Sequence, residues 1–350
     1  MARHLIVLGF AKCGTSLLHE TLKNCPEFHL PTYKETNFFS WDWHEDLNRY
    51  YYKYPEPQRA MAAGKIFFDS SPTYFGKNYP KVLERIKSTL GDSAKFIICL
   101  RNPIYRAFSH YKHQINAHYA RYGFFAKRQT ENFKQVYNQS FFDSEVLNNK
   151  LVFDSYLDKI VTAQQILGKD NILYFSLEKD TKNFDGFYRQ LCDFLKTDYQ
   201  PYFAHQPLSK VLVGDYISHY RYAPKDLIFH SDRQIYRIPQ GGLFLFSNRG
   251  HELFTDLSQD KILACLSASQ RWTKVLPEAI ARQLFELKFA DDSSKLETLI
   301  DFDFSTWTKF KTKVTPLAEF QPQYLENSVW QKAEALSLEA PKINQLLALT

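Results

Sequence analysis

The fold of this chain is decided near its start, by Leu5-Ile6-Val7-Leu8-Gly9-Phe10-Ala11-Lys12-Cys13-Gly14-Thr15-Ser16-Leu17-Leu18. The first four residues predict a short buried strand, and the closing apolar run predicts a helix. A strand that turns through glycines into a helix N-terminus binds anions, because loop N–H groups point inward and the helix dipole adds about half a positive charge. Lys12 adds a full charge inside this loop.

The spacing from Gly9 to Gly14 is that of a Walker A loop, but the residue order differs. A Walker A loop has a lysine directly after the second glycine, followed by Ser or Thr for magnesium. Here Thr15 follows Gly14, and Lys12 precedes that glycine by two positions. We therefore expect a loop that binds a phosphate-like group without the nucleoside-triphosphatase arrangement. The alternative is an ordinary glycine-containing turn between a strand and a helix.

Length and composition fit one large α/β domain or two smaller ones, since the chain has 350 residues and is 44% hydrophobic. The formal net charge is +6, which is compatible with an anionic cofactor or substrate. This surplus is too small to indicate a nucleic-acid partner. The sequence does not indicate an oligomeric state.

Cysteine usage and the first residues bear on the cellular compartment. The five cysteines are widely scattered without any CxxC spacing, which predicts reduced thiols and neither a disulfide framework nor a zinc site. The first strand begins almost at once, so no signal peptide is expected. No apolar run approaches the roughly 18 residues of a membrane span. We therefore expect a soluble, cytoplasmic protein, or a domain of a larger cytoplasmic protein.

Strand and helix patterns alternate along the first two hundred residues, which predicts a parallel, doubly wound α/β sheet. We expect one domain over residues 1–310, with a lid or substrate insertion at about 118–150. A helical tail or linker is expected over 311–350. Strands are predicted at 65–69, 94–100 and 171–176, and helices at 16–24, 79–90, 154–167, 181–195, 258–268, 277–289 and 291–300.

A second anion site is predicted where the apolar run Lys95–Leu100 ends in Arg101-Asn102-Pro103. Arginine is a permanent, bidentate ligand of phosphate groups. Ser109 lies about two turns along the helix that Pro103 opens. Since ligands bind parallel sheets at the carboxyl ends of the strands, two anion sites are expected at this edge. A ligand with two phosphate-like groups on one adenosine would suit both.

Each of three further segments allows two interpretations. Lys34-Glu35 is either a solvated surface pair or, at a strand end, a source of a general base. The aromatic-rich stretch 41–54, with Trp41 and Trp43, either lines an acceptor cleft or packs as a helix and loop. Arg249-Gly250 either closes over a phosphate or forms a solvated loop.

Four segments together resemble the sulfotransferases that use 3′-phosphoadenosine 5′-phosphosulfate (PAPS). Gly9–Ser16 resembles their 5′-phosphosulfate loop, and Arg101–Pro103 with Arg106 and Ser109 looks like their 3′-phosphate motif. Residues 34–39 are similar to the Lys-Glu-x-x-Phe-Phe segment of the glycan-modifying branch, which includes the heparan sulfate enzymes. Residues 69–75 match a further family segment. The order and spacing agree over about residues 4–120.

The resemblance implies a P-loop-like, three-layer fold, with a mostly parallel sheet flanked by helices and a helical C-terminal part. It implies that Lys12 stabilises negative charge at the bridging oxygen and that Glu35 removes the acceptor's proton. It further implies that the cofactor is held by Ala11, Lys12, Cys13, Gly14, Thr15, Ser16, Arg101, Ser109, Arg249 and Gly250.

The implied reaction moves a sulfuryl group from PAPS to a hydroxyl or amine, with adenosine 3′,5′-bisphosphate as product and no metal. A carbohydrate acceptor is expected, contacted by Lys34, Ser70, Trp41 and Trp43. Many glycan-modifying members have a lysine where this chain has Ser70, so a second cation is missing there or its role passes to Lys34 or a later basic residue. The alternatives are sulfation of a non-carbohydrate small molecule or an acyl-chain hydroxyl, a P-loop kinase, and a non-catalytic anion- or glycan-binding module.

Overall fold

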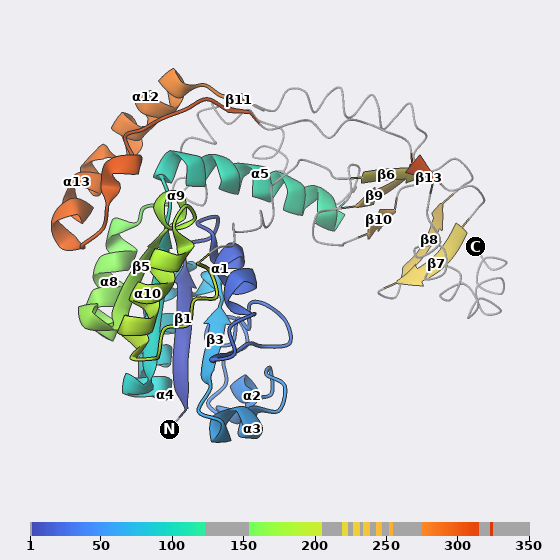
Figure 1. Cartoon of the computed structure of the whole chain (residues 1–350). Coiled ribbons are helices and arrows are strands. Elements are labelled where there is room, and N and C mark those ends of the chain that lie inside the picture. Colours follow the sequence, from blue (N-terminus) through green and yellow to red (C-terminus); the bar gives the residue numbers. More distant parts are fainter. Residues whose placement is uncertain are drawn as a thin grey trace. The chain divides into compact units, whose positions relative to one another are not determined.

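The apolar run at the start of the chain forms the central strand of a five-stranded parallel sheet (Figure 1). Strand β1 (Arg3–Gly9) lies between β3 (Ile66–Ser70) and β4 (Ala94–Leu100). The outer strands are β2 (Phe28–His29), beside β3, and β5 (Ile172–Ser176), beside β4. Leu5 to Leu8 are fully buried, as expected of a parallel strand covered on both faces. The predicted α/β fold is confirmed.

The computed structural model describes residues 2–122, 154–204, 219–222, 227–231, 234–238, 243–246, 252–254, 275–314 and 323–324. The chain divides into two compact units. The first contains Met1–His110, Phe153–Val213 and Pro277–Lys311, and the second contains the remaining segments. Most of the predicted insertion at about 118–150, and the predicted helix at 258–268, lie outside the described residues.

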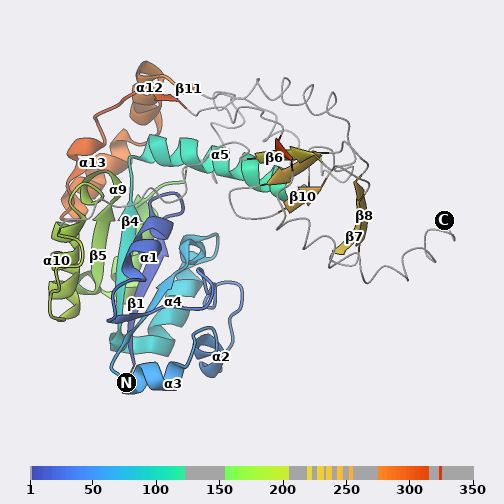
Figure 2. The same ribbon diagram turned by 45° about the vertical axis from the view of Figure 1, so that its right-hand side comes forward.

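Helices flank the sheet of the first unit (Figures 1 and 2). Helix α1 (Thr15–Leu22) follows β1 and contacts β3, while α4 (Tyr79–Leu90) and α8 (Leu157–Leu167) contact each other. Helix α10 (Phe184–Leu195) contacts β5 and buries six of its twelve side chains, so its apolar face covers the sheet. The shorter helices are α2 (Asn48–Tyr51), α3 (Pro57–Ala62) and α9 (Leu177–Asp180).

Helix α5 (Pro103–Tyr122) leaves the carboxyl end of β4, and its start is tied to a late segment of the chain. Asn102 accepts hydrogen bonds from the amides of Ile104 and Tyr105, which caps α5. The Asn102 side chain also donates to the carbonyl of buried Trp307 at 2.7 Å. Before this tryptophan come α12 (Glu278–Lys288), α13 (Ala290–Leu299) and the 3₁₀ turn η4 (Phe304–Thr306), so the two helices predicted there are confirmed.

The described part of the second unit consists mainly of short strands. Strand β9 (Leu243–Phe246) pairs antiparallel with β6 (His219–Tyr222) and β10 (Glu252–Phe254). Strands β7 (Leu227–Ser231) and β8 (Gln234–Ile238) form an antiparallel pair. Two more strands fall in or near the predicted tail: β12 (Lys313–Val314), which pairs with β11 (Val275–Leu276), and β13 (Gln323–Tyr324), which pairs with β6.

Candidate active site

The loop between β1 and α1 has the backbone geometry of an anion cradle. Gly9, Lys12 and Gly14 all have positive φ, at 144°, 70° and 96°. The loop is held to the sheet by the Phe10 amide, which donates to the Cys99 carbonyl at 3.0 Å. No side chain in the described part of the chain caps α1, and first-turn amides have no partner within a helix. These amides are therefore available to an anion at the carboxyl end of β1.

Position 14 favours glycine, chiefly through its backbone. Its φ of 96° strains any other residue. A Cβ there would also lie 2.7 Å from Leu177 Cδ1 and 3.3 Å from Phe175 Cε1, so the half-buried Leu177 side chain would have to shift.

Cys13 is a packed residue on the inner side of the loop. It is fully buried, and its Sγ lies 3.4 Å from the hydroxyl of Tyr156. Burial raises the pKa of the Cys13 thiol to about 11, so the thiol stays protonated at neutral pH. The Cys13 amide donates to the Phe10 carbonyl at 3.2 Å, so this residue helps to shape the loop.

Arg101, the residue predicted for the second anion site, contacts the loop between β1 and α1. Its Nη1 donates to the Lys12 carbonyl at 3.1 Å, and its Nε lies 3.8 Å from a carboxylate oxygen of Glu178. This Nε is buried and makes no hydrogen bond to any described residue. Ser109 is half-buried further along α5. Arg101, at the end of β4, thus lies against the glycine-bounded loop that carries Lys12 at the end of β1.

Arg106 has a different position from the one that the motif suggested. It is only 3% exposed and lies 5.0 Å from the ring centroids of both Phe10 and Tyr156. Its guanidinium donates to the Ala11 carbonyl at 3.3 Å and to the Asp154 carboxylate at 3.0 Å. With its donors committed to protein acceptors, Arg106 braces the loop from the protein interior.

Lys34 and Glu35 form an ion pair that remains partly open to solvent. Lys34 Nζ donates to Glu35 Oε1 at 2.6 Å, and the two side chains are 20% and 37% exposed. Glu35 has a φ of 69° and Asn37 a φ of 51°, both in the left-handed region. The Asn37 side chain donates to the Glu35 carbonyl at 3.1 Å. Glu35 therefore stands on a tightly folded turn, with its carboxylate reachable by a ligand.

The two tryptophans that were expected to contact the acceptor, Trp41 and Trp43, have different surroundings. Trp43 is half-buried, with its ring 5.9 Å from that of Phe38 and 5.1 Å from the Arg85 guanidinium, so it packs. Trp41 is 74% exposed, and the two other most exposed aromatics in the described chain are Tyr33 at 82% and Tyr52 at 76%.

These three exposed aromatics belong to neighbouring segments. The Thr32 amide donates to the Lys53 carbonyl at 2.9 Å, and Lys53 Nζ donates to the Asp42 carboxylate at 2.7 Å. Each of these residues directly precedes or follows one of the exposed aromatics in the sequence. We refer to Tyr33, Trp41 and Tyr52 as the exposed aromatic group; it adjoins Lys34 and Glu35.

A family model described as the sulfotransferase domain matches residues 2–222. The chain belongs to the sulfotransferase family. The human bifunctional heparan sulfate N-deacetylase/N-sulfotransferase 2 is 34% identical over 115 residues, which is 31% of this chain and 12% of that protein. The membrane-associated sulfotransferase kil1 of Dictyostelium discoideum is 30% identical over 112 residues, which is 32% of this chain and 23% of that protein.

The chain thus matches only a small part of the length of these curated relatives. Among solved structures, a sulfotransferase from Alicyclobacillus acidocaldarius aligns with a TM-score of 0.46 and 20% identity, over 88% of this chain and 100% of that one. None of the helices in the described segments is long and apolar enough to cross a bilayer.

Of the other expected residues, one is buried beneath the start of α1 and two lie outside the described chain. Ser70 is fully buried and donates to the Thr15 carbonyl at 3.1 Å, so its side chain supports α1 and faces no open surface. Arg249 and Gly250 lie outside the described residues. His110, on α5, has its pKa lowered to about 3 by burial first and then by the charges of Arg106 and Lys12.

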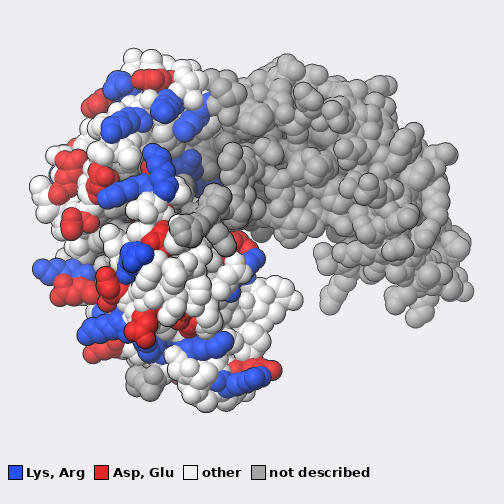
Figure 3. Space-filling view, in the orientation of Figure 1, with Lys and Arg blue, Asp and Glu red and all other residues white. Residues whose placement is uncertain are grey.

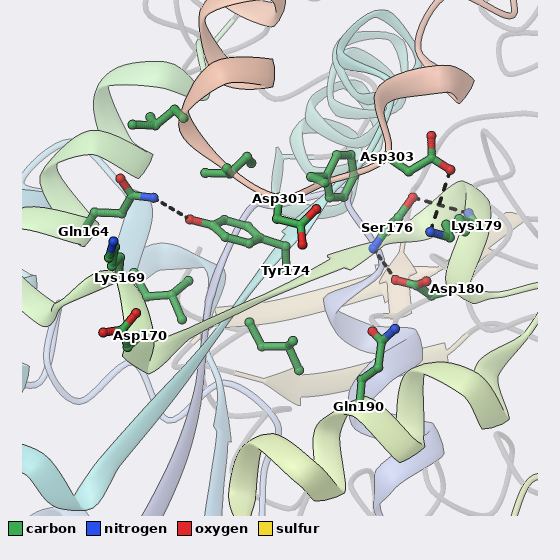
Figure 4. Close-up of a pocket in the computed structure, with 15 residues that line it drawn as sticks. Gln164, Lys169, Asp170, Tyr174, Ser176, Lys179, Asp180, Gln190, Asp301 and Asp303 are labelled. Atoms are coloured by element: carbon green, nitrogen blue, oxygen red, sulfur yellow. Dashed lines mark hydrogen bonds and ion pairs between the residues drawn. The ribbon is translucent and has the colours of Figure 1, made fainter.

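Charged side chains of both signs are mixed over the face of the first unit that Figure 3 presents. A cavity of about 650 Å³ opens at the outer edge of β5 (Figure 4). Its lining includes Asp170, Asp180, Asp301 and Asp303, with the Ser176 amide donating to Asp180 at 2.6 Å. The lining also includes Lys169 and Lys179, but neither the loop nor Glu35. This cavity is therefore distinct from the candidate active site.

Asp69 organises the surroundings of the Glu35 turn and was not predicted as a site residue. Its fully buried carboxylate accepts hydrogen bonds from the hydroxyls of Thr36, Ser71 and Tyr74 at 2.6, 2.7 and 2.6 Å. An aspartate within the fully buried strand Ile66–Ser70 was the signal that could have identified it, because buried carboxylates need specific partners.

Proposed function

We propose that this sulfotransferase transfers a sulfuryl group from PAPS to a hydroxyl or amine of a carbohydrate, with Glu35 as the general base. The observation that carries the proposal is the contact of Arg101 with the loop that leads into the uncapped N-terminus of α1. Arg101 Nη1 lies 3.1 Å from the carbonyl of Lys12, a residue of that loop, so the second predicted anion site adjoins the first. A donor that carries a 5′-phosphosulfate and a 3′-phosphate on one adenosine fits two cations placed in this way.

The residues present suit such a donor. The first-turn amides of α1, the hydroxyls of Thr15 and Ser16, and the backbone of Ala11 and Gly14 would hold the phosphosulfate. Arg101 has a buried Nε with no hydrogen-bond partner among the described residues, and together with Ser109 it would hold the 3′-phosphate. Arg249 and Gly250 are proposed to close over the bound cofactor.

The chemistry is divided between the two sides of the site. The donor, when bound, supplies an activated sulfuryl group. Lys12 stabilises negative charge on the leaving phosphate, and the preorganised loop amides assist it. Glu35 accepts the proton of the attacking hydroxyl or amine, while Lys34, at 2.6 Å from Oε1, fixes the orientation of the carboxylate. Positioning and charge stabilisation are the main sources of rate, and the scheme requires no metal.

The exposed aromatic group supports a glycan acceptor. Flat aromatic faces left open to solvent beside Glu35 match the apolar faces of sugar rings. The name of the human relative refers to heparan sulfate, which makes an amino sugar the first acceptor to test. Trp41 is proposed to contact the acceptor directly. The packed ring of Trp43 would support this surface from behind.

The test combines binding with turnover. Adenosine 3′,5′-bisphosphate binding is measured by calorimetry, and radiolabelled sulfate transfer from PAPS is measured with N-deacetylated heparosan, unsulfated chondroitin and a simple phenol. We expect micromolar binding and sulfation of a glycan. Replacing Lys12 or Arg101 by Ala should weaken bisphosphate binding about 10- to 100-fold, the size of a lost charge-assisted contact. Absence of binding and transfer, or magnesium-dependent ATP turnover instead, would contradict the proposal.

A further inference from the structure

The buried carboxylate of Asp69 is connected to the turn that carries Glu35. We infer that Asp69 is a positioning residue, whose two carboxylate oxygens set the backbone of this turn through two separate hydrogen-bond chains. The inference rests on the proposed role of Glu35 as the base. Asp69 itself is fully buried in β3 and touches neither donor nor acceptor.

Each chain runs from one carboxylate oxygen through one hydroxyl to one backbone amide. Asp69 Oδ2 accepts from the Thr36 hydroxyl at 2.6 Å, and Thr36 Oγ1 accepts from the Phe38 amide at 3.3 Å. Asp69 Oδ1 accepts from the Ser71 hydroxyl at 2.7 Å, and Ser71 Oγ accepts from the Asn37 amide at 3.1 Å. Two consecutive amides after Thr36 are thus anchored on the two oxygens of one side chain.

In both hydrogen-bond chains the hydroxyl donates toward position 69. This direction requires a side chain at position 69 that accepts hydrogen bonds and donates none. A hydroxyl has a single proton to donate. Because Thr36 and Ser71 give their protons to the carboxylate, their lone pairs face the amides of the turn. Burial raises the pKa of Asp69, while its hydrogen bonds from Thr36, Tyr74 and Ser71 act in the opposite direction. An ionised Asp69 satisfies every donor around it.

Asn37 connects these two anchored amides to Glu35 through its side chain. The Asn37 side chain donates to the Glu35 carbonyl at 3.1 Å, and its Oδ1 accepts from the Thr73 hydroxyl at 2.6 Å. Glu35 and Asn37 both hold positive φ values, which L-residues adopt only when the surroundings impose them. The Asp69 chains and the Asn37 side chain together impose this turn, and the turn sets where the Glu35 carboxylate stands.

The decisive variant is Asp69→Asn, which keeps the shape of the side chain but turns one acceptor into a donor. One hydroxyl must then accept from position 69, so it loses the acceptor that fixed the direction of its proton and of its lone pairs. The comparison variant is Tyr74→Phe, which removes a 2.6 Å hydrogen bond to the same carboxylate and a 3.0 Å contact with the Thr36 hydroxyl, but leaves both routes from the carboxylate to the turn amides in place. Ser71→Ala breaks one chain and keeps the carboxylate, and it replaces Asp69→Asn if that variant does not fold.

We expect Asp69→Asn to lower kcat about 10- to 100-fold, the range that follows from misplacing a reacting group. Its KM for PAPS and its affinity for adenosine 3′,5′-bisphosphate should stay within about 2-fold of wild type, because the loop is untouched. Tyr74→Phe should keep kcat within about 3-fold. Equal losses of kcat in the two variants, or a loss of bisphosphate affinity, would show that Asp69 acts only through general stability and would overturn the inference.

Hydrogen exchange gives a readout that does not depend on turnover. In the folded protein, the amides of Asn37 and Phe38 should exchange at least about 10-fold faster in Asp69→Asn than in wild type or Tyr74→Phe. If wild type transfers no sulfuryl group, the proposed function fails, and this comparison still tests the positioning of the turn. Unchanged exchange in Asp69→Asn would refute the inference whatever the activity.

Discussion

Replacing Gly14 by Ala is the most direct perturbation of the loop that organises the site. Two costs follow from the structure. An L-residue at a φ of 96° loses about 1–2 kcal/mol, and a Cβ at 2.7 Å from Leu177 Cδ1 adds an overpacking cost of about 1 kcal/mol, because the tip of this half-buried side chain can shift. The expected loss of unfolding free energy is therefore about 2–3 kcal/mol, a substantial part of the 5–15 kcal/mol typical of folded proteins.

Gly64 provides the matched control, because it also has a positive φ, 67°, but no atom lies within 4 Å of its Cβ position. Gly64→Ala should therefore show only the backbone cost, about 1–2 kcal/mol. In a double-mutant cycle, Leu177→Ala should return part of the loss in Gly14→Ala, since it removes the nearest contact, while Phe175 at 3.3 Å remains.

The assay is urea unfolding of all four variants, paired with calorimetric titration of adenosine 3′,5′-bisphosphate. Gly14→Ala should weaken the bisphosphate affinity as well as stability, whereas Gly64→Ala should leave the affinity unchanged. Equal stability losses for the two glycine variants, with no coupling to Leu177, would refute the argument that close packing adds to the backbone cost at position 14.

Three further outcomes are expected. Trp41→Ala should lower kcat/KM for a glycan acceptor about 5-fold, the size of one aromatic contact, and leave bisphosphate affinity unchanged; an unchanged kcat/KM would remove Trp41 from the acceptor site. Burial lowers the pKa of His4 to about 4, so the unfolded chain takes up this proton before the folded protein does as the pH falls. Wild type should therefore lose about 2 kcal/mol of unfolding free energy between pH 7 and pH 5. A His4→Asn variant, compared with wild type by urea unfolding, should not show this loss. The Cys13 thiol, with its pKa raised to about 11, should resist iodoacetamide at pH 8 in the folded protein, and rapid labelling detected by mass spectrometry would contradict its burial.

The fold was predictable because its signals are local. The continuous apolar runs that form β1 and β4 are typical of central parallel strands, and the alternation of strand and helix patterns predicted a parallel sheet. The glycine loop was predictable for the same reason, since its backbone conformation depends on residues that are adjacent in the sequence. Gly9, Lys12 and Gly14 indeed hold the positive φ values of such a turn.

The roles of individual side chains depend on contacts between distant segments, and here the sequence was less informative. Arg106 is committed to Asp154, 48 positions away, and Ser70 to the carbonyl of Thr15, 55 positions away. Trp41 and Trp43 are two residues apart, yet one is exposed and the other packs against Arg85. No local pattern distinguishes these outcomes, because each is set by which elements meet in the folded chain.

The central claim, that Glu35 takes the proton of the acceptor during sulfuryl transfer, is tested most directly by single-turnover transfer from PAPS in Glu35→Gln. Gln keeps the shape of Glu35 and removes the base. The proposal predicts bisphosphate affinity within about 2-fold of wild type, and a rate of transfer at least about 100-fold lower. Exposed Glu45→Gln serves as the control and should keep the wild-type rate. A Glu35→Gln protein that transfers sulfate at the wild-type rate would show that another group is the base.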